Sequence, residues 1–328
     1  MIKKSINNYK NEIDNLEGLE KYEDALIVCN EALSLYSDDS SLYNYKGCIL
    51  SNLDDIIGAI KSYDQGIQLE PNNDVFYYNK AVELEALGEF EDAIGCITKA
   101  IALNSNDSDY YLTKANLYSS IDRYEDSLIY YDKASQLDNN DSSIYCDKSY
   151  ALLQLKRYAE VIPCCDIAIK INKKDVESYI NKGYALDLLG EFEESLLCYD
   201  KVLELEPNNY FAYSNKSCLL SNMKKYDEAL LCAEKAIQIN ENIPVGYINK
   251  ALALNKLQRY TEAIEICDIA LKIDVNEFDS YTNKGFALSM LGKHKEALEA
   301  YNNALEINPN CINTQKSIDL ILEKIKSL

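Results

Sequence analysis

Histidine, the side chain that most often exchanges protons near neutral pH, occurs once in the sequence, at His294. Serine and cysteine nucleophiles usually depend on a histidine base, so such a site would have to be built on this residue. The place of His294 in its segment is filled by an aromatic residue in most related segments, which favours a role in packing. No glycine-rich phosphate-binding motif occurs. The sequence therefore predicts a protein that is not an enzyme.

The eleven cysteines are an odd number and include no C-x-x-C pair. Several recur at one of two adjacent places in a 34-residue period: Cys96, Cys164, Cys198 and Cys232 at the first, and Cys29, Cys165 and Cys267 at the second. Zinc and iron–sulfur sites need clustered ligands, which this spacing does not supply. We therefore expect no metal, no cofactor and reduced thiols that pack as small apolar groups, as in the cytoplasm.

A row of asparagines could bind a ligand without doing chemistry. These residues share one place in the same period: Asn79, Asn181, Asn215, Asn249 and Asn283. Asparagine is a mediocre helix former, so helix propensity does not explain the row. Its amide offers both a donor and an acceptor, which match the edge of an extended peptide backbone. The row predicts contacts to a bound peptide, and the alternative is common descent of repeat copies with no ligand.

A strict 34-residue period positions these side chains. Tyrosine recurs at that spacing in nine places: Tyr9, Tyr43, Tyr77, Tyr111, Tyr145, Tyr179, Tyr213, Tyr247 and Tyr281. The period divides the sequence into nine repeats without an insertion: 6–39, 40–73, 74–107, 108–141, 142–175, 176–209, 210–243, 244–277 and 278–311. In the repeat 176–209, apolar residues at helical spacing surround Gly190, and Pro207 follows them. Each repeat is therefore expected to form two helices joined by a tight turn.

The side-chain sizes within the repeat form a signature. Positions 8, 20 and 27 are mostly small, position 4 is tyrosine, position 17 is usually aromatic, and proline at position 32 survives as Pro71, Pro207 and Pro309. This pattern resembles the tetratricopeptide repeat family and covers residues 6–311. It departs from the family at position 7, where lysine replaces leucine from Lys46 to Lys284. We interpret these lysines as lying along the tyrosine of position 4 with the ammonium in water.

The resemblance implies an all-α fold, a right-handed α-solenoid or superhelix, whose first helices line a concave groove. The asparagine row then resembles the ladder that holds peptide main chain in the repeat superhelix of O-linked N-acetylglucosamine transferases. Apolar candidates for the same groove lie beside it, at positions 2, 5 and 9 of the later repeats: Ile180, Tyr184, Phe211, Val245, Ile248, Leu252 and Phe286. An apolar stripe beside polar groups is typical of a binding surface.

Charge narrows the class of partner. The net charge of −21 disfavours nucleic acid and anionic lipid, so we expect a neutral or basic protein or peptide. The carboxylate clamp of chaperone-binding members is absent, because Lys10 is the only lysine at position 5 and Asp14 and Tyr45 follow where asparagines are needed. No segment is apolar enough to span a membrane, and the first residues do not form a secretory signal.

The two ends depart from the period. Residues 1–5 form a short basic extension, and residues 312–328 carry an apolar face formed by Ile318, Ile321, Leu322, Ile325 and Leu328. We expect this segment to be a capping helix that covers the last repeat. Pro163 lies inside an expected second helix, where we expect a kink or a late start.

The sequence thus favours a non-catalytic scaffold or adaptor that binds an extended segment of a partner in its groove. Two alternatives remain at this stage. The chain could be a substrate-selecting superhelix that works with a separate glycosyltransferase, or a structural solenoid that assembles with itself.

Overall fold

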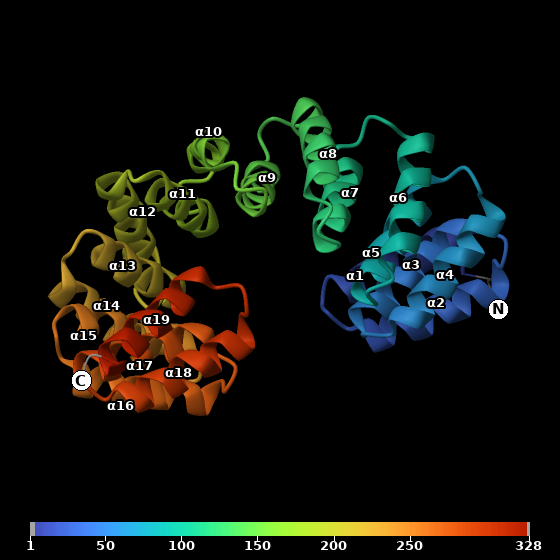
Figure 1. The fold of residues 1–328 in the computed structure, drawn as a ribbon. Helices are drawn as coiled ribbons and strands as arrows, with labels where there is room; N and C mark the ends of the chain where they lie inside the picture. The colour runs from blue at the N-terminus through green and yellow to red at the C-terminus, as the bar shows by residue number, and fades with distance from the viewer. Residues whose placement is uncertain (1–3, 327–328) are drawn as a thin grey trace. The chain divides into compact units, whose positions relative to one another are not determined.

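Residues 4–326 are described in the computed structural model, and they form nineteen α-helices and no strand. The chain divides into two compact units, Met1–Arg157 and Tyr158–Leu328, here called unit 1 and unit 2. Figure 1 shows the helices of each unit along the chain. The division falls inside the repeat 142–175, between its two helices.

Unit 1 contains four complete helix pairs and the first helix of a fifth. Its helices are α1 (Ile6–Glu17), α2 (Tyr22–Leu35), α3 (Ser40–Asn52), α4 (Ile56–Leu69), α5 (Asp74–Ala86), α6 (Phe90–Leu103), α7 (Ser108–Ser120), α8 (Tyr124–Leu137) and α9 (Ser142–Gln154). Each first helix begins at position 1 of its repeat and each second helix at position 17.

Unit 2 continues the same alternation. Its helices are α10 (Tyr158–Ile171), α11 (Val176–Leu189), α12 (Phe192–Leu205), α13 (Tyr210–Asn222), α14 (Tyr226–Ile239), α15 (Pro244–Lys256), α16 (Tyr260–Ile273), α17 (Phe278–Met290), α18 (His294–Ile307) and α19 (Ile312–Lys326). Pro163 lies within α10, which nevertheless begins at position 17 as the other second helices do. The expectation of a late start is wrong, because the five residues before Pro163 are already helical.

The turn between the two helices of a repeat has one backbone conformation throughout. Position 15 is left-handed in all nine repeats, at Glu20, Asp54, Gly88, Asp122, Lys156, Gly190, Lys224, Gln258 and Gly292. Glycine adopts this conformation without strain, whereas a residue with a Cβ adopts it at a cost. The turn geometry is therefore imposed by the packing of the two helices, and glycine fills it in only three repeats.

Small residues allow the two helices of a repeat to approach closely. A Cβ added to Gly47 would lie 2.2 Å from the Tyr63 ring, and one added to Gly183 would lie 3.0 Å from the Tyr199 ring. Both tyrosines are almost completely buried. In these two repeats the glycine at position 8 is thus matched by a tyrosine ring at position 24, which fills the space beside it.

Lysines at position 7 connect consecutive repeats. Six of the eight pair with the acid sixteen residues earlier, on the second helix of the preceding repeat: Lys80 with Asp64, Lys148 with Asp132, Lys182 with Asp166, Lys216 with Asp200, Lys250 with Glu234 and Lys284 with Asp268. Lys46 has Asn30 in the place of the acid. Lys114 differs because Thr98 occupies the place of the acid, and its Nζ lies 4.5 Å from the centre of the Tyr130 ring. The paired lysine side chains remain partly exposed, and the interpretation from the sequence did not include the carboxylate partners of their ammonium groups.

The last helix, α19, covers the end of unit 2 through part of its apolar face. Ile318 and Ile321 are buried against α17 and α18. Leu322 and Ile325 remain about 40% exposed, because only the side of α19 that carries the two isoleucines faces this cluster. The expected capping face is thus narrower than the sequence indicated, and Leu328 lies outside the described residues.

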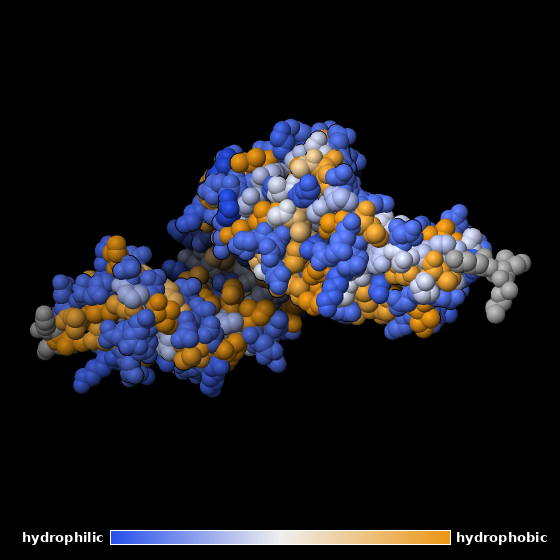
Figure 2. Space-filling model, turned by 90° about the vertical axis from the view of Figure 1, so that its right-hand side faces the viewer, coloured by the Kyte–Doolittle hydropathy of each residue, from blue (hydrophilic) through white to orange (hydrophobic). Residues whose placement is uncertain are grey.

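On the face that Figure 2 shows, apolar residues form separate patches within a largely hydrophilic surface. Within residues 4–326, no helix combines the length and the apolar character needed to cross a membrane.

Candidate functional site

Position 6 is asparagine twice in unit 1, at Asn11 and Asn79, and Asn79 contacts the preceding first helix. Asn79, on α5, donates a hydrogen bond from Nδ2 to Oδ1 of Asn44 on α3, at 2.9 Å. Both side chains are half-buried. The Asn79 amide is therefore partly engaged inside the protein, and its remaining hydrogen-bonding groups stay at the edge of the surface.

The asparagines of unit 2 are not equivalent to one another. Asn249 is only 8% exposed, and its Nδ2 lies 2.9 Å from the backbone oxygen and 3.2 Å from the hydroxyl oxygen of Ser214 on α13. This differs from the expectation that Asn249 presents its amide towards a groove, because the small Ser214 lets α15 approach α13. Asn181, Asn215 and Asn283 are half-buried.

The apolar residues predicted from the sequence all lie in unit 2, on the first helices α11, α13, α15 and α17. Phe211 is 63% exposed, and Tyr184, Val245 and Phe286 are also exposed. The others, Ile180, Ile248 and Leu252, are half-buried. Contacts of α11 with α13, α13 with α15 and α15 with α17 bring these helices together. We call the side chains at positions 2, 5, 6 and 9 of these four helices the first-helix surface of unit 2.

Position 12 also contributes polar groups, and the asparagine row did not include it. Asn255, at position 12 of α15, donates from Nδ2 to the backbone oxygen of Asn283 at 3.0 Å. Asp187, at position 12 of α11, accepts a hydrogen bond from Asn222 at 3.2 Å. Position 12 is polar in eight of the nine repeats, with Leu153 the exception, and that regularity was the available signal.

A cavity of about 340 Å³ lies at the end of the first-helix surface. It is formed by α15, α17, α18 and α19, and three of the predicted residues line it, namely Leu252, Asn283 and Phe286. The remaining lining residues are Asn255, Lys256, Phe278, Thr282, Tyr301, Cys311, Asn313, Thr314 and Ser317. The sequence did not indicate this cavity, because α19 contributes to it from outside the repeats.

Two carboxylates lie on the first helices of unit 2, Asp187 half-buried at position 12 of α11 and Asp279 exposed at position 2 of α17. Burial raises the pKa of Asp279, and burial raises the pKa of Asp187 against the opposing effect of its hydrogen bond from Asn222. Asp279 forms no ion pair within residues 4–326. A cation placed beside these groups would favour their charged forms.

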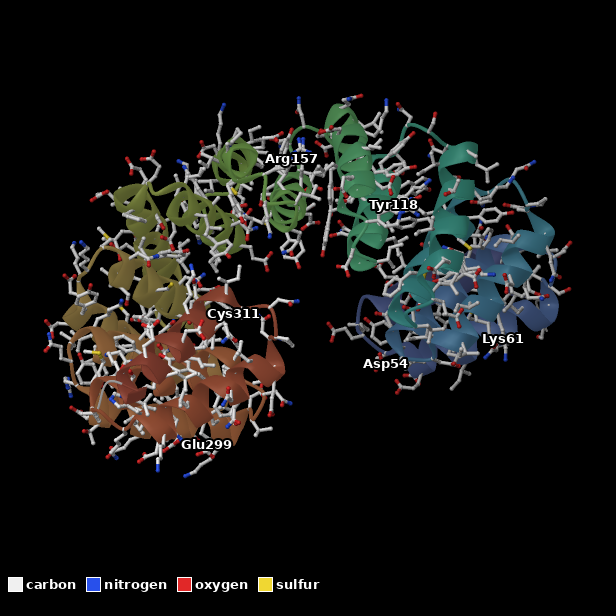
Figure 3. All side chains as sticks on the ribbon, viewed as in Figure 1. Asp54, Lys61, Tyr118, Arg157, Glu299 and Cys311 are labelled. Atoms are coloured by element: carbon white, nitrogen blue, oxygen red, sulfur yellow. The ribbon has the colours of Figure 1, made fainter. Side chains whose placement is uncertain are left out.

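Cys311 lies immediately before α19 at the edge of the cavity (Figure 3). The Thr314 hydroxyl donates to its Sγ at 3.2 Å. This hydrogen bond, together with backbone N–H groups at the start of α19, lowers the pKa of the Cys311 thiol. All eleven cysteines of the sequence lie within the described residues, and none of them forms a disulfide.

Groups suited to catalysis or metal binding do not gather in the described chain. No three His, Cys, Asp or Glu side chains of residues 4–326 are placed to hold a metal ion together. His294 is the half-buried first residue of α18, and its Nδ1 is buried without a hydrogen-bond partner in that part of the chain. The site therefore offers apolar contact, amides and carboxylates, which are groups that bind.

Family models for the tetratricopeptide repeat match more than half of the chain. The matched residues are 40–73, 78–142, 176–209, 198–230, 246–276 and 278–311. The chain belongs to the tetratricopeptide repeat family. Its repeats consist of helix pairs joined by a left-handed turn, and glycines of some repeats pack against tyrosine rings. No curated protein gives a sequence match.

Solved tetratricopeptide structures share the fold at low sequence identity. YrrB, described as having an unusual peptide-binding site, is 22% identical over 57% of this chain and 97% of its own, with a TM-score of 0.51. The Cut9–Hcn1 hetero-tetramer of the APC/C is 16% identical over 92% and 60%, with a TM-score of 0.63. Yeast Tom70 is 14% identical over 98% and 96%, with a TM-score of 0.51.

Proposed function

We propose that this tetratricopeptide repeat protein is a non-catalytic scaffold whose unit 2 binds an extended segment of a partner protein on its first-helix surface. The observation that carries the proposal is the exposure of Tyr184, Phe211, Val245 and Phe286 on four successive first helices. Large exposed apolar side chains beside polar groups are typical of interaction surfaces. Repeat proteins of this family generally act as protein-interaction scaffolds, which supports the same conclusion.

The charge of the surface favours a basic segment. Asp187 is half-buried and Asp279 is exposed, and partial loss of solvent around each carboxyl raises the pKa of both. A lysine or arginine of the partner would restore the charged form of these carboxylates and gain an ion pair that is partly shielded from solvent. Asn215 and Asn283 complete the proposal as half-buried amides available to peptide main chain, whereas Asn249 is used inside the protein.

The test compares two double variants at exposed apolar positions. Phe211→Ala with Phe286→Ala removes rings from the first-helix surface, and Leu197→Ala with Leu231→Ala removes exposed leucines of α12 and α14. Peptides selected by the wild-type protein from a random displayed library are measured against both. We expect at least tenfold weaker binding for the first variant only.

Two results would contradict the proposal. The library could yield no peptide that binds the wild-type protein, or the selected peptides could bind both double variants equally well.

A third variant, Asp187→Asn with Asp279→Asn, tests the preference for basic segments. If the proposal is correct, lysine and arginine become less frequent among peptides selected by that variant.

A further inference from the structure

A groove of about 500 Å³ in unit 2 is lined by an unusual concentration of lysine. It is formed by the end of α10, the turn that follows α10, α11 and α12, and it contains no side chain of the first-helix surface. A protein with a net charge of −21 thus places four lysines around one groove, here called the lysine groove: Lys170, Lys173, Lys174 and Lys201.

Two of these lysines occupy a turn that does not need them. Lys173 and Lys174 are the central residues of the turn closed by the hydrogen bond from the Asp175 N–H to the Asn172 oxygen, at 3.1 Å. Position 33, which Lys174 occupies, is asparagine in seven of the other eight repeats and aspartate in the eighth. Asparagine and aspartate favour turns through their short polar side chains, whereas lysine has no such effect. Turn formation therefore does not explain the two lysines.

Three of the four groove lysines form no ion pair within residues 4–326, namely Lys170, Lys173 and Lys174. Lys201 pairs with Glu204 at 2.9 Å. The one acid of the lining, Asp166, is already paired with Lys182 of α11. The groove therefore keeps three positive charges that no carboxylate of the described chain contacts.

A groove of about 570 Å³ in unit 1 is balanced in charge. Its lining contains Lys80 and Lys99, and it also contains Glu89 and Asp92. Tyr77 lines it from position 4, the position from which Tyr179 lines the lysine groove. The excess of positive charge is thus a property of one groove and not of the repeat.

The lysine groove also offers apolar contact and a free hydroxyl. Ile169, Tyr179 and Leu205 line it and are half-buried. The Tyr77 hydroxyl donates to the backbone oxygen of Pro71 at 3.1 Å, whereas the Tyr179 hydroxyl forms no hydrogen bond within residues 4–326. The groove therefore presents N–H and O–H donors beside apolar side chains.

An acidic peptide segment that carries an apolar side chain between its carboxylates matches these groups. Ammonium groups only donate, so their partners must be acceptors, and anionic acceptors bind them most strongly. The lysines come from three separate segments, and apolar side chains line the groove with them. This arrangement favours several carboxylates around an apolar group. A single phosphate is bound best by the planar fork of arginine, and the lining contains no arginine.

We propose that the lysine groove binds an acidic segment of a partner protein, with an apolar side chain of that segment against Ile169 and Leu205. The inference goes beyond the proposed function, because it concerns other side chains and a segment of the opposite charge. A scaffold with both surfaces would hold a basic segment and an acidic segment at the same time.

The net charge of the protein does not prevent this binding at physiological salt. A charge of −21 repels an anion at long range. The Debye length is about 8 Å at physiological ionic strength, so a bound segment responds mainly to the charges that line its groove. Those charges are mostly positive in the lysine groove.

The test uses a short peptide with one phenylalanine between runs of glutamate. The peptide is labelled with tetramethylrhodamine, and its anisotropy is measured with the full chain at physiological salt. We expect saturable binding. A peptide with glutamine in place of glutamate should bind about tenfold more weakly, because the ion pairs with the lysines are lost. Absence of saturable binding, or equal binding of the glutamine peptide, would overturn the proposal.

A third peptide tests the apolar contact. Serine in place of the phenylalanine should weaken binding about fivefold, because the ring no longer covers apolar surface in the groove. Equal binding of the serine peptide would show attraction between charges alone and would overturn the assigned mode of binding.

A double variant locates the bound peptide. Lys173→Ser with Lys174→Asn gives the turn the residues that the repeat 74–107 carries there, Ser105 and Asn106, so the fold should be retained. We expect about tenfold weaker binding of the glutamate peptide. Unchanged binding by this variant would overturn the location.

The matched control removes the same charge elsewhere in unit 2. Lys224 and Lys225 are adjacent, exposed and outside the groove, and Gln258 already occupies the repeat position of Lys224. Lys224→Gln with Lys225→Gln should bind the glutamate peptide as the wild-type protein does. An equal loss in both double variants would show that net charge governs binding and would overturn the proposal.

Other anions are compared on the wild-type protein. An uncharged peptide that carries one phosphoserine, and a short poly(U) RNA, should both bind more weakly than the glutamate peptide. Tighter binding of either would overturn the choice of an acidic protein segment as the occupant.

The outcome is separable from that of the proposed function. Phe211→Ala with Phe286→Ala should leave binding of the glutamate peptide unchanged, because neither ring lines the lysine groove. A loss of binding in that variant would place the peptide on the first-helix surface and overturn the location. Failure of the glutamate peptide, together with successful selection of peptides on the first-helix surface, would end this inference and leave the proposed function intact.

Discussion

The same position of the repeat has different roles in the two units. Asn79 in unit 1 is half-buried and contacts another side chain, that of Asn44. Asn249 in unit 2 is buried and contacts the main chain of Ser214. The deciding residue is the one at position 5 of the preceding repeat, which is asparagine in the first case and serine in the second. A small neighbour lets the first helices approach, and the amide becomes part of the packing.

The approach of successive first helices also differs between the two units. In unit 2, α13 and α17 each contact α15 more extensively than successive first helices contact one another in unit 1. In unit 1 rings lie between successive first helices instead, such as the half-buried Tyr78 stacked on the buried Tyr110 with ring centres 5.0 Å apart. An asparagine row in a repeat sequence can therefore be internal structure in one unit and surface in another.

The largest expected effect concerns the close contacts at position 8. Gly47→Ala in unit 1 should lower the free energy of unfolding by about 1–3 kcal/mol, because the new Cβ would lie 2.2 Å from the buried Tyr63 ring. Gly183→Ala in unit 2 meets Tyr199 at 3.0 Å and also gains helix propensity, so its change should stay within about 1 kcal/mol of zero. Urea unfolding of both variants measures the difference, and equal midpoints would contradict it.

The second-largest difference between the units is expected in the alkylation rates of two thiols. Burial raises the pKa of Cys48 in unit 1, and hydrogen bonds lower the pKa of Cys311 in unit 2, although both are half-buried. At pH 7.5, below the ordinary thiol pKa, a lower pKa gives more thiolate, so Cys311 should alkylate at least about tenfold faster. Mass spectrometry of timed iodoacetamide reactions measures both rates.

The control for this prediction removes the hydroxyl donor. Thr314→Val should raise the pKa of Cys311 and shift its alkylation profile to higher pH, and Thr314→Ser should restore it. An unchanged profile in Thr314→Val would show that the hydroxyl does not stabilise the thiolate.

The asparagine comparison itself gives an intermediate effect. Asn249→Ala should lower the free energy of unfolding by about 1–2 kcal/mol, because two buried hydrogen bonds to Ser214 are lost. Asn79→Ala should cost less than about 0.5 kcal/mol, because its contact with Asn44 lies partly in solvent. Thermal unfolding followed by circular dichroism tests the order, and a larger effect at Asn79 would reverse the comparison.

The smallest effects are expected at the position 7 lysines. Lys148→Met should cost about 0.5 kcal/mol, and less at high salt, because its ion pair with Asp132 is partly exposed. Lys114 is only 7% exposed, and burial lowers its pKa. Lys114→Met should therefore be neutral or stabilising, because a buried ammonium without a carboxylate partner is removed. Destabilisation by Lys114→Met equal to that of Lys148→Met would contradict this reasoning.

The fold was predictable from the sequence because the repeat fixes both the helix starts and the small residues between the helices. Gly190 revealed the left-handed turn, but Lys224 and Gln258 adopt it without any local sign, since tertiary packing imposes it. The candidate site was only partly predictable. The burial of Asn249 depends on Ser214 one repeat earlier, and the hydrogen bond of the Asn255 amide depends on the main chain of α17.

The lysine–acid pairs between repeats also bear on how the protein opens. In unit 2, α11, α13, α15 and α17 each carry such a pair to the preceding second helix. In unit 1, Asn30 and Thr98 stand where Lys46 and Lys114 would find an acid. Stability in a solenoid is a sum over neighbouring interfaces, so an interface without its pair is a weaker link. We therefore expect partial opening of unit 1 to be slightly easier at these two interfaces, each of which lacks the roughly 0.5 kcal/mol of one partly exposed ion pair.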